Sequence, residues 1–385
     1  MKHIKSFLIF CTVFLSLTAC SYPGLFAGIE SEVKLKDPSV TSTTEHLCYD
    51  DTYEFVSNGT IFMKKAGGRT LPDSGAFREI GLTGGYLWAV NFDSSSMEFK
   101  GLYYIDTASI DTASIENWVE FNTDGLDGTD GLDGTPYRIL ELQGNSSIYL
   151  LTRKRAGNNY TYRIYRITGA VLEPSPVFEI GSSGSNENND STRPLAVAES
   201  GTDFLVLTKA KLYKNSTGDV LSDAGSFIAL AKGSGDNVYV MNQSGGIRLY
   251  NGTGLEELKN FDFTPSENSP KSLAFVSGDS GIKGAENGML LVGCGSGYRE
   301  IILGADGAVP SSYQEPGASD TSTILTSKKS QYSSSIGYYP VHCVFPVVMA
   351  GTEYKYRVYA LVMDSGDTCL WSYYPDDSSP SWNRD

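Results

Sequence analysis

The stretch NVYVMNQSGGIRLYNGTG, residues 237–254, has two short runs of alternating apolar and polar residues on either side of a turn. Ser244-Gly245-Gly246 supplies that turn, and Asn251-Gly252 supplies a second one at the end of the stretch. An alternation with a period of two places successive side chains on opposite faces of a β-strand, and Gly-rich pairs favour tight reversals. The stretch therefore predicts two antiparallel strands followed by another reversal of the chain.

The same signals recur along the rest of the chain. YKYRVYALVMDSGDTCLWSYY (354–374) predicts two strands around Asp364–Asp367, and YTYRIYRITG (160–169) alternates Tyr and Ile with polar residues. The only helical candidates are short and lie near Ser114–Phe121 and Gly254–Phe261. We expect an all-β fold.

Apolar strands of four to six residues, each after a polar or Gly-rich turn, recur along the sequence. They begin at Tyr53, Leu87, Ile148, Phe204, Val238, Met289 and Val358, with a mean spacing of about 51 residues. The blades of a β-propeller are four-stranded sheets that repeat every 40–50 residues or so. We therefore predict a β-propeller of six or seven degenerate blades. A large β-sandwich arrangement is the alternative, because it can produce similar strands.

The amino-terminal segment predicts export and a lipid anchor. Lys2 and Lys5 precede an apolar run over residues 6–17, which is shorter than the roughly 20 residues of a membrane-spanning helix. Leu17-Thr18-Ala19-Cys20 follows this run and resembles the bacterial lipobox. The resemblance implies cleavage before Cys20, acylation of that cysteine with chains such as palmitate, and attachment to a membrane. We expect a signal peptide over residues 1–19, a flexible tether over 20–44 and the propeller-like domain over 45–385.

Charge limits the partners of this chain. The formal net charge is −15, and removal of Lys2 and Lys5 with the signal leaves −17. A surface of this sign repels nucleic acid and anionic lipid, so the acyl chains are expected to provide the contact with the membrane. We expect a monomer that binds no nucleic acid.

One basic stretch departs from this acidic background. LTRKRAGNNYTYRIYR (151–166) predicts a hairpin in which basic residues alternate with tyrosines. Such a surface can contact an acidic protein or an anionic glycan, because Arg pairs with carboxylates and Tyr stacks. The alternative is an exposed hairpin whose charges prevent edge-to-edge pairing. The candidate partner-binding residues are Arg153, Lys154, Arg155, Tyr160 and Tyr162.

The cysteines allow disulfides in an exported protein. Cys11 leaves with the signal and Cys20 is the expected lipidation site, so four cysteines remain. An even number permits two disulfides, while buried thiols are the alternative. The candidate disulfide cysteines are Cys48, Cys294, Cys343 and Cys369.

Motifs of catalysis and metal binding are missing from the sequence. Only His46 and His342 remain after the signal, and no nucleophile elbow, zinc motif or phosphate loop occurs. The repeat DGLDGTDGLDGT (124–135) carries four aspartates but not the pattern of a calcium loop, and we read it as a surface loop. We therefore expect no cofactor, no metal and no catalytic residue. Abundant carboxylates keep one alternative open, a carbohydrate-active enzyme that uses carboxylates of the propeller funnel.

The lipobox together with a Tyr-, Ser- and Gly-rich β body resembles uncharacterised lipoproteins of spirochaetes such as the treponemes. The resemblance implies a cell-envelope protein, and Ser21, which is not Asp, favours the outer membrane, facing the periplasm or the cell surface. We expect a non-enzymatic module that presents a propeller loop face to a protein or glycan. A periplasmic scaffold for envelope assembly is a further alternative, although the tryptophan-docking motif of the propeller lipoproteins with that role does not occur here.

Overall fold

The computed structural model describes residues 46–384 with gaps between strands, of which the longest are 123–133, 182–189, 262–268, 311–340, 349–355 and 374–381. The predicted signal and tether, residues 1–44, lie outside the described residues, as does Glu45. The compact unit Val40–Asp385 contains all the strands given below.

The described chain forms seven antiparallel sheets, numbered here in chain order. Sheets 1 to 3 contain β1 (His46–Tyr49), β2 (Glu54–Ser57), β3 (Ile61–Met63) and β4 (Arg69–Thr70); β5 (Ala76–Thr83), β6 (Tyr86–Phe92), β7 (Phe99–Asp106) and β8 (Val119–Phe121); and β9 (Thr135–Leu140), β10 (Ile148–Ala156), β11 (Asn159–Thr168), β12 (Val171–Leu172) and β13 (Phe178–Gly181).

Sheets 4 to 7 follow the same plan. They contain β14 (Pro194–Ser200), β15 (Asp203–Thr208), β16 (Leu212–Lys214) and β17 (Asp219–Ser222); β18 (Phe227–Lys232), β19 (Val238–Asn242), β20 (Gly246–Tyr250) and β21 (Lys259–Asn260); β22 (Pro270–Val276), β23 (Met289–Cys294) and β24 (Tyr298–Ile302); and β25 (Val341–Val348), β26 (Tyr356–Asp364), β27 (Asp367–Tyr373) and β28 (Trp382–Arg384). Every sheet is built from strands that are consecutive along the chain. Two 3₁₀ turns, η1 (Thr107–Thr112) and η6 (Ala305–Gly307), follow β7 and β24.

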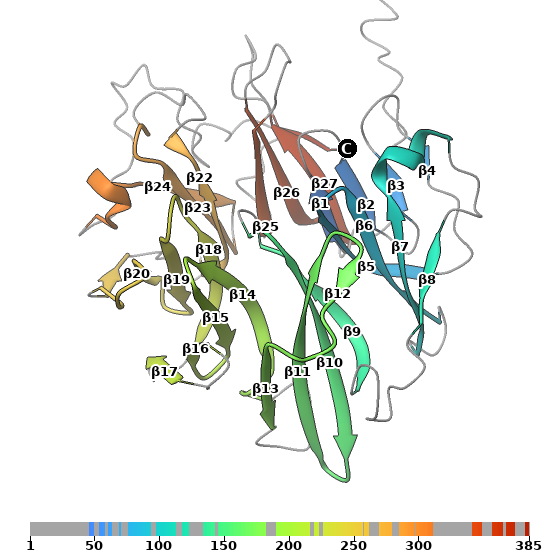
Figure 1. Ribbon diagram of the computed structural model, residues 1–385. Helices are drawn as coiled ribbons and strands as arrows, with labels where there is room; N and C mark the ends of the chain where they lie inside the picture. Colours follow the sequence, from blue (N-terminus) through green and yellow to red (C-terminus); the bar gives the residue numbers. More distant parts are fainter. Residues whose placement is uncertain are drawn as a thin grey trace, which may run out of the picture. The chain divides into compact units, whose positions relative to one another are not determined.

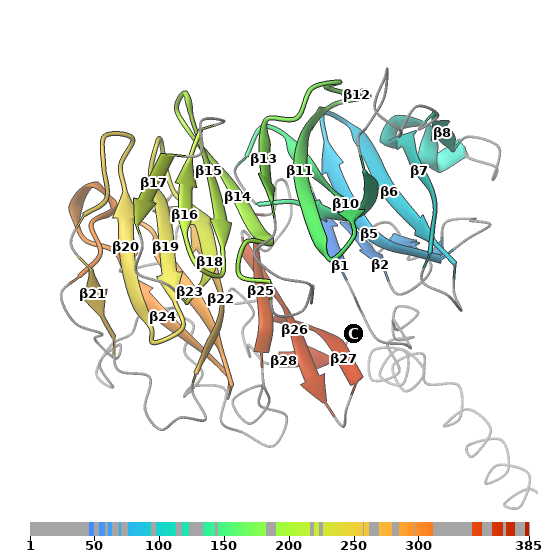
Figure 2. The same ribbon diagram turned by 90° about the horizontal axis from the view of Figure 1, so that it is seen from below.

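The sheets follow one another in a ring (Figure 1 and Figure 2). The first strand of each sheet packs beside the first strand of the next, from β1 and β5 through to β22 and β25. A hydrophobic cluster fills each boundary between consecutive sheets. A seventh cluster joins Leu47 and Val56 of sheet 1 to Leu361 and Leu370 of sheet 7, which closes the ring. The chain is a β-propeller, as the sequence predicts, and the sandwich alternative is wrong.

The second strand of every sheet is buried on both faces. In β19, Val238 and Val240 face the cluster toward sheet 4, while Tyr239 and Met241 face the cluster toward sheet 6. A strand buried on both sides reads as a continuous apolar run. The seven repeated apolar segments of the sequence lie in these second strands: β2, β6, β10, β15, β19, β23 and β26.

Both helical candidates of the sequence are wrong where the structure describes them. Val119–Phe121 forms β8, and Leu255 makes an isolated bridge to Tyr250 before β21. These short segments pair with the third strand of their own sheet, because an outer strand can be brief and polar and still complete a blade. In the described part of the chain, no helix is long and apolar enough to span a membrane.

Candidate functional site

The basic hairpin, defined as Arg153–Tyr160, is the end of the β10–β11 ladder in sheet 3. The strands pair in register up to Ala156 and Asn159, and Gly157 occupies the turn with a φ of 63°. A positive φ costs glycine little, so the chain reverses in two residues. The neighbouring strand β9 pairs only as far as Arg153. The hairpin therefore extends beyond the first strand of its own sheet (Figure 1), and the predicted hairpin is confirmed.

Aromatic rings position the two arginines of the hairpin. The Cζ atom of Arg155 lies 5.9 Å from the ring centroid of Tyr160, and Arg155 Nε donates to the Gly157 carbonyl at 3.1 Å. The Cζ atom of Arg153 lies 5.0 Å from the ring of Tyr137. Arg155 and Lys154 are exposed, and Arg153 is partly exposed. Cations held over aromatic faces keep their charge in reach of a partner while losing less freedom on binding.

The prediction that Tyr162 contacts a partner is wrong. Its side chain is fully buried in the cluster between sheets 3 and 4, and its hydroxyl donates to Asp190 Oδ2 at 3.1 Å. Tyr160 and Tyr162 lie on the same face of β11, but sheet 4 covers Tyr162, whereas Tyr160, two residues nearer the turn, is only partly buried. The structure therefore leaves Arg153, Lys154, Arg155 and Tyr160 at the candidate surface.

The remaining arginines of the basic stretch are balanced within sheet 3. Arg163 Nε lies 2.7 Å from Glu179 Oε2 of β13, and Arg166 lies 3.6 Å from Glu173. These ion pairs connect β11 to the segment that follows it.

The cysteines do not form the expected framework. Cys294 is a free, buried thiol whose Sγ donates to the Val292 carbonyl at 3.4 Å, and burial raises its pKa to about 12. Cys343 and Cys369 lie on β25 and β27, on either side of β26. Strands two apart are separated by about 9.5 Å, beyond the roughly 7 Å limit for a disulfide. Cys48 and Cys369 belong to different core clusters. The predictions of a disulfide through Cys294, or between Cys369 and either Cys343 or Cys48, are therefore wrong. A Cys48–Cys343 bond stays a prediction.

Carboxylates at the ends of the first strands connect neighbouring sheets. Glu79 of β5 accepts from the Ile139 amide at 3.2 Å, and Glu141 accepts from the Leu82 amide at 3.3 Å. Burial raises the pKa of Glu79, against the opposing effects of Arg138 and the Ile139 amide. These reciprocal bonds join sheets 2 and 3.

Glu199 of β14 joins sheets 4 and 3 in the same way. It accepts from the Ser146 amide at 2.9 Å and from the Tyr149 hydroxyl at 2.5 Å. Burial alone raises the pKa of Glu199, but the hydrogen bonds from Tyr149 and Ser146 overcome it and lower the pKa. The pKa values of Glu79 and Glu199 thus shift in opposite directions, but each carboxylate is bonded at a different sheet boundary. A structural role accounts for both.

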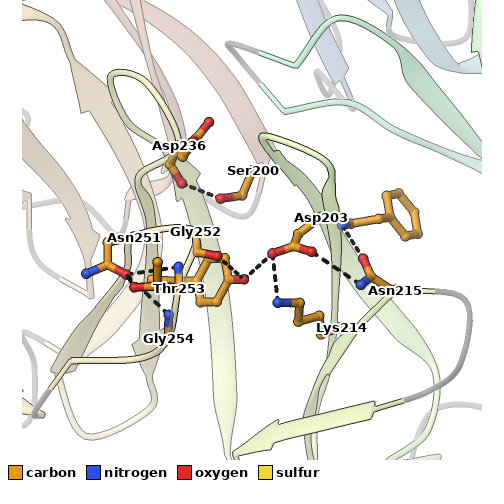
Figure 3. A network of polar contacts seen from close by, with 11 residues as sticks. Ser200, Asp203, Lys214, Asn215, Asp236, Asn251, Gly252, Thr253 and Gly254 are labelled. Atoms are coloured by element: carbon orange, nitrogen blue, oxygen red, sulfur yellow. Dashed lines mark hydrogen bonds and ion pairs between the residues drawn. The ribbon is translucent and has the colours of Figure 1, made fainter.

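A network of polar contacts centred on Asp203 joins sheets 4 and 5 (Figure 3). Asp203 pairs with Lys214 Nζ at 2.8 Å, accepts from Asn215 Nδ2 at 3.3 Å and accepts from the Tyr250 hydroxyl of sheet 5. Nearby, the Ser200 hydroxyl donates to the Asp236 carbonyl. Asn251 Oδ1 accepts from the amides of Thr253 and Gly254, so the predicted turn at Asn251-Gly252 is confirmed.

A polar cavity of about 470 Å³ lies at the boundary of sheets 5 and 6. Its walls come from the turn between β18 and β19, the loop between β22 and β23, and η6. No sequence motif marks this cavity, because its residues come from three separate segments of the chain.

The predicted lipidation site, Cys20, lies outside the described residues, as do the aspartates of the predicted surface loop at 124, 127, 130 and 133. Within the described part of the chain, no group of three His, Cys, Asp or Glu side chains could hold a metal ion.

Solved structures with a similar fold are β-propellers or contain them. YCF48 bound to D1 peptide is 12% identical over 88% of this chain and 94% of that chain, with a TM-score of 0.50. An ancestral GH74 enzyme is 9% identical over 90% of this chain and 47% of that chain, with a TM-score of 0.55. BBS1N in complex with ARL6DN is 12% identical over 89% and 95%, with a TM-score of 0.45. No protein-family model and no curated protein matches the chain. At these identities the likeness concerns the fold alone.

Proposed function

We propose that this chain is a non-enzymatic interaction module of the bacterial cell envelope that binds an acidic segment of a protein partner through the basic hairpin. The observation that carries the proposal is a group of three cations, Arg153, Lys154 and Arg155, at the end of a hairpin that extends past its inner strand, in a chain of net charge −15. A local positive site on an acidic surface selects a partner of opposite sign and repels others.

A protein segment fits this site better than an extended glycan. Arg153 and Arg155 present planar guanidinium groups that pair with carboxylates in two-point contacts. Tyr160 adds an aromatic ring beside Arg155, and tyrosines are frequent at protein interfaces. The YCF48 structure, whose protein is bound to D1 peptide, gives a propeller precedent for a peptide ligand.

The module is held at the outer membrane by a lipid on Cys20. The basis of this part of the proposal is the sequence Leu17-Thr18-Ala19-Cys20 behind a basic and apolar leader. Residues 20–44 then separate the anchor from the propeller.

Substitution of Cys20 tests the anchor. In the bacterial host, Cys20→Ala removes the thiol that receives the lipid, so the precursor should stay uncleaved and leave the detergent phase of a Triton X-114 partition. Mass spectrometry of the amino terminus checks both effects. Ser21→Ala is the control and should partition like the parent chain. Unchanged mass and partitioning in Cys20→Ala would refute the anchor.

Substitution of the hairpin tests the interface. The triple variant Arg153→Ser, Lys154→Ser, Arg155→Ser should weaken binding of a fluorescent polyglutamate peptide by about tenfold or more at low salt, equivalent to about 1.4 kcal/mol. The difference should shrink as salt rises, because screening shortens the reach of exposed charges. Fluorescence anisotropy measures both.

A matched control comes from the equivalent turn of sheet 4. Lys209→Ser with Lys211→Ser removes two cations between β15 and β16, away from the hairpin, and should change the affinity little. If the control and the triple variant lost the same affinity for polyglutamate, the effect would come from the net charge of the chain, and the proposal would be contradicted. Hydrolysis of a glycan panel by the purified chain, abolished by Glu79→Gln, would favour the enzyme alternative instead.

A further inference from the structure

The cavity at the boundary of sheets 5 and 6 has the size and chemistry of a site for a small polar ligand. Its volume of about 470 Å³ lies within the range of roughly 300–1,000 Å³ that is common for such sites. It lies on other sheets than the basic hairpin of sheet 3, so the inference below is independent of the proposed function.

The charge of the lining restricts the ligand. Asp306 and Glu286 contribute carboxylates, and the described lining contains no Lys, Arg or His. An anionic ligand is therefore disfavoured, because it would meet charges of its own sign. Among the described residues, no group of three His, Cys, Asp or Glu side chains gathers here for a metal ion. The lining therefore suits an organic ligand without negative charge.

Amides and carboxylate oxygens give the cavity both donors and acceptors. Asn237 Nδ2 donates to the Asp306 carbonyl at 3.1 Å, which fixes the amide plane and orients Asn237 Oδ1 as an acceptor. Asn287 and the carboxylate of Asp306 are exposed at the mouth. Hydroxyl groups both donate and accept, so a polyhydroxylated ligand can satisfy amides and carboxylates together.

An aromatic pair forms the apolar part of the wall. The rings of Tyr239 and Phe275 are stacked with centroids 5.9 Å apart and an interplanar angle of 18°. Tyr239 is held by its hydroxyl, which donates to the Gly307 carbonyl at 2.8 Å, while Phe275 is only partly buried. Tyr239 is fully buried behind this stack, so the partly exposed ring of Phe275 is the one that can contact the C–H face of a sugar ring.

The backbone at the cavity is held in an unusual conformation. Asp306 has a φ of 57°, a left-handed conformation that non-glycine residues seldom adopt. Residues held in such conformations cluster at ligand sites. We propose that this cavity binds a neutral saccharide of one or two rings.

Titration of the full chain with named sugars tests the proposal. Glucose, N-acetylglucosamine, maltose and cellobiose are titrated by ligand-observed NMR, with saturation at concentrations on the order of 10 mM or below expected for at least one. The double variant Asn287→Ala, Asp306→Gly should raise its Kd by about tenfold or more. Glycine accepts the positive φ of residue 306, and both side chains are exposed, so the fold should persist.

Two controls separate the outcomes. Thr202→Ala removes an exposed side chain from the corresponding turn of sheet 4, and the triple hairpin variant leaves the cavity intact; both should bind the sugar like the parent chain. The cavity variant should in turn bind polyglutamate normally. The proposal is overturned if none of the four sugars saturates, if the double variant binds as tightly as the parent, or if the cavity instead binds calcium alone.

Discussion

Single aromatic residues with a polar tip connect four of the seven second strands to a following sheet. Trp88 Nε1 donates to the Gly169 carbonyl of sheet 3 at 2.8 Å, and Tyr149 donates to Glu199 of sheet 4. Tyr239 donates to Gly307 beyond sheet 6, and Tyr359 donates to Glu54 of sheet 1 at 2.5 Å. All four rings are fully buried, and each occupies the position of its strand that faces the following sheet. A buried ring with a bonded tip fixes the position of one sheet on the next, because misplacement leaves the tip without its partner.

The stability of the boundary between sheets 4 and 5 depends on pH because of Asp203. Burial alone would raise its pKa, but hydrogen bonds from Lys214, Tyr250 and Asn215 lower it below the usual value of 3.8. A carboxyl whose pKa is lower in the folded state adds stability above its unfolded pKa, and this contribution disappears as the pH falls through the folded pKa. The same contact raises the pKa of Lys214, so its own contribution is present below the unfolded pKa of lysine and is lost at strongly alkaline pH.

We therefore expect Asp203→Asn to lower the Tm at pH 7 by roughly 2–4 °C. The difference from the parent chain should shrink below about pH 4, because the parent then loses the same charge. Thermal unfolding followed by circular dichroism from pH 2.5 to 7 checks this. Asp236→Asn is the control, because the backbone carbonyl of Asp236, not its carboxylate, accepts from Ser200. A difference that is constant with pH would contradict the role of the charge.

At the scale of elements, the sequence predicts best the second strands, which have apolar neighbours on both faces. The second strands are apolar on both faces because each lies between two clusters, and their repeat gave the blade spacing. Outer strands are short and polar, so the sequence pattern wrongly predicts helical segments where β8 and β21 lie. Their conformation is imposed by pairing with the neighbouring strand, which a local pattern does not contain.

The basic hairpin shows the same limit at the candidate site. Its alternation predicted the β10–β11 ladder and placed Arg153 and Arg155 on one face. The same face carries Tyr162, which pairs with Arg153, and sheet 4 packs on this face away from the turn. The alternation alone therefore predicts a surface position for Tyr162, although the residue is buried. Contacts between sheets, not periodicity, decide which tyrosines of a hairpin reach solvent.

At the scale of the whole molecule, the boundary between sheets 1 and 7 differs from the other six. Elsewhere, adjacent sheets are also consecutive along the chain. Sheets 1 and 7 are joined by the cluster of Leu47, Val56, Leu361 and Leu370 and by the bond from Tyr359 to Glu54. Because each described sheet is built from consecutive strands, side chains carry this closure.

We expect Leu361→Ala to destabilise the chain by about 2–5 kcal/mol and to open this boundary before the rest. Hydrogen exchange should quicken in β1, β2 and β26 well below the denaturant midpoint, since those strands lose their packing first. Leu290→Ala, in the cluster between sheets 5 and 6, is the matched control and should leave exchange in β1 slow under the same conditions. Equal exchange in β1 for both variants would show that the ring opens as one unit.

The consecutive order of strands also decides how the molecule responds to mechanical load. A force pulling β1 and β28 apart acts on two neighbouring sheets and separates side-chain contacts one after another, instead of shearing a ladder of hydrogen bonds. The propeller should then unwind from both ends, one sheet at a time, in the manner of a linear array of repeats. In a protein tethered by residues before β1 and held by a partner at sheet 3, the covalent chain would carry tension across sheets 1 to 3. The chain of sheets 4 to 7, with the cavity between sheets 5 and 6, would be loaded only through the side-chain contacts that close the ring between sheets 1 and 7.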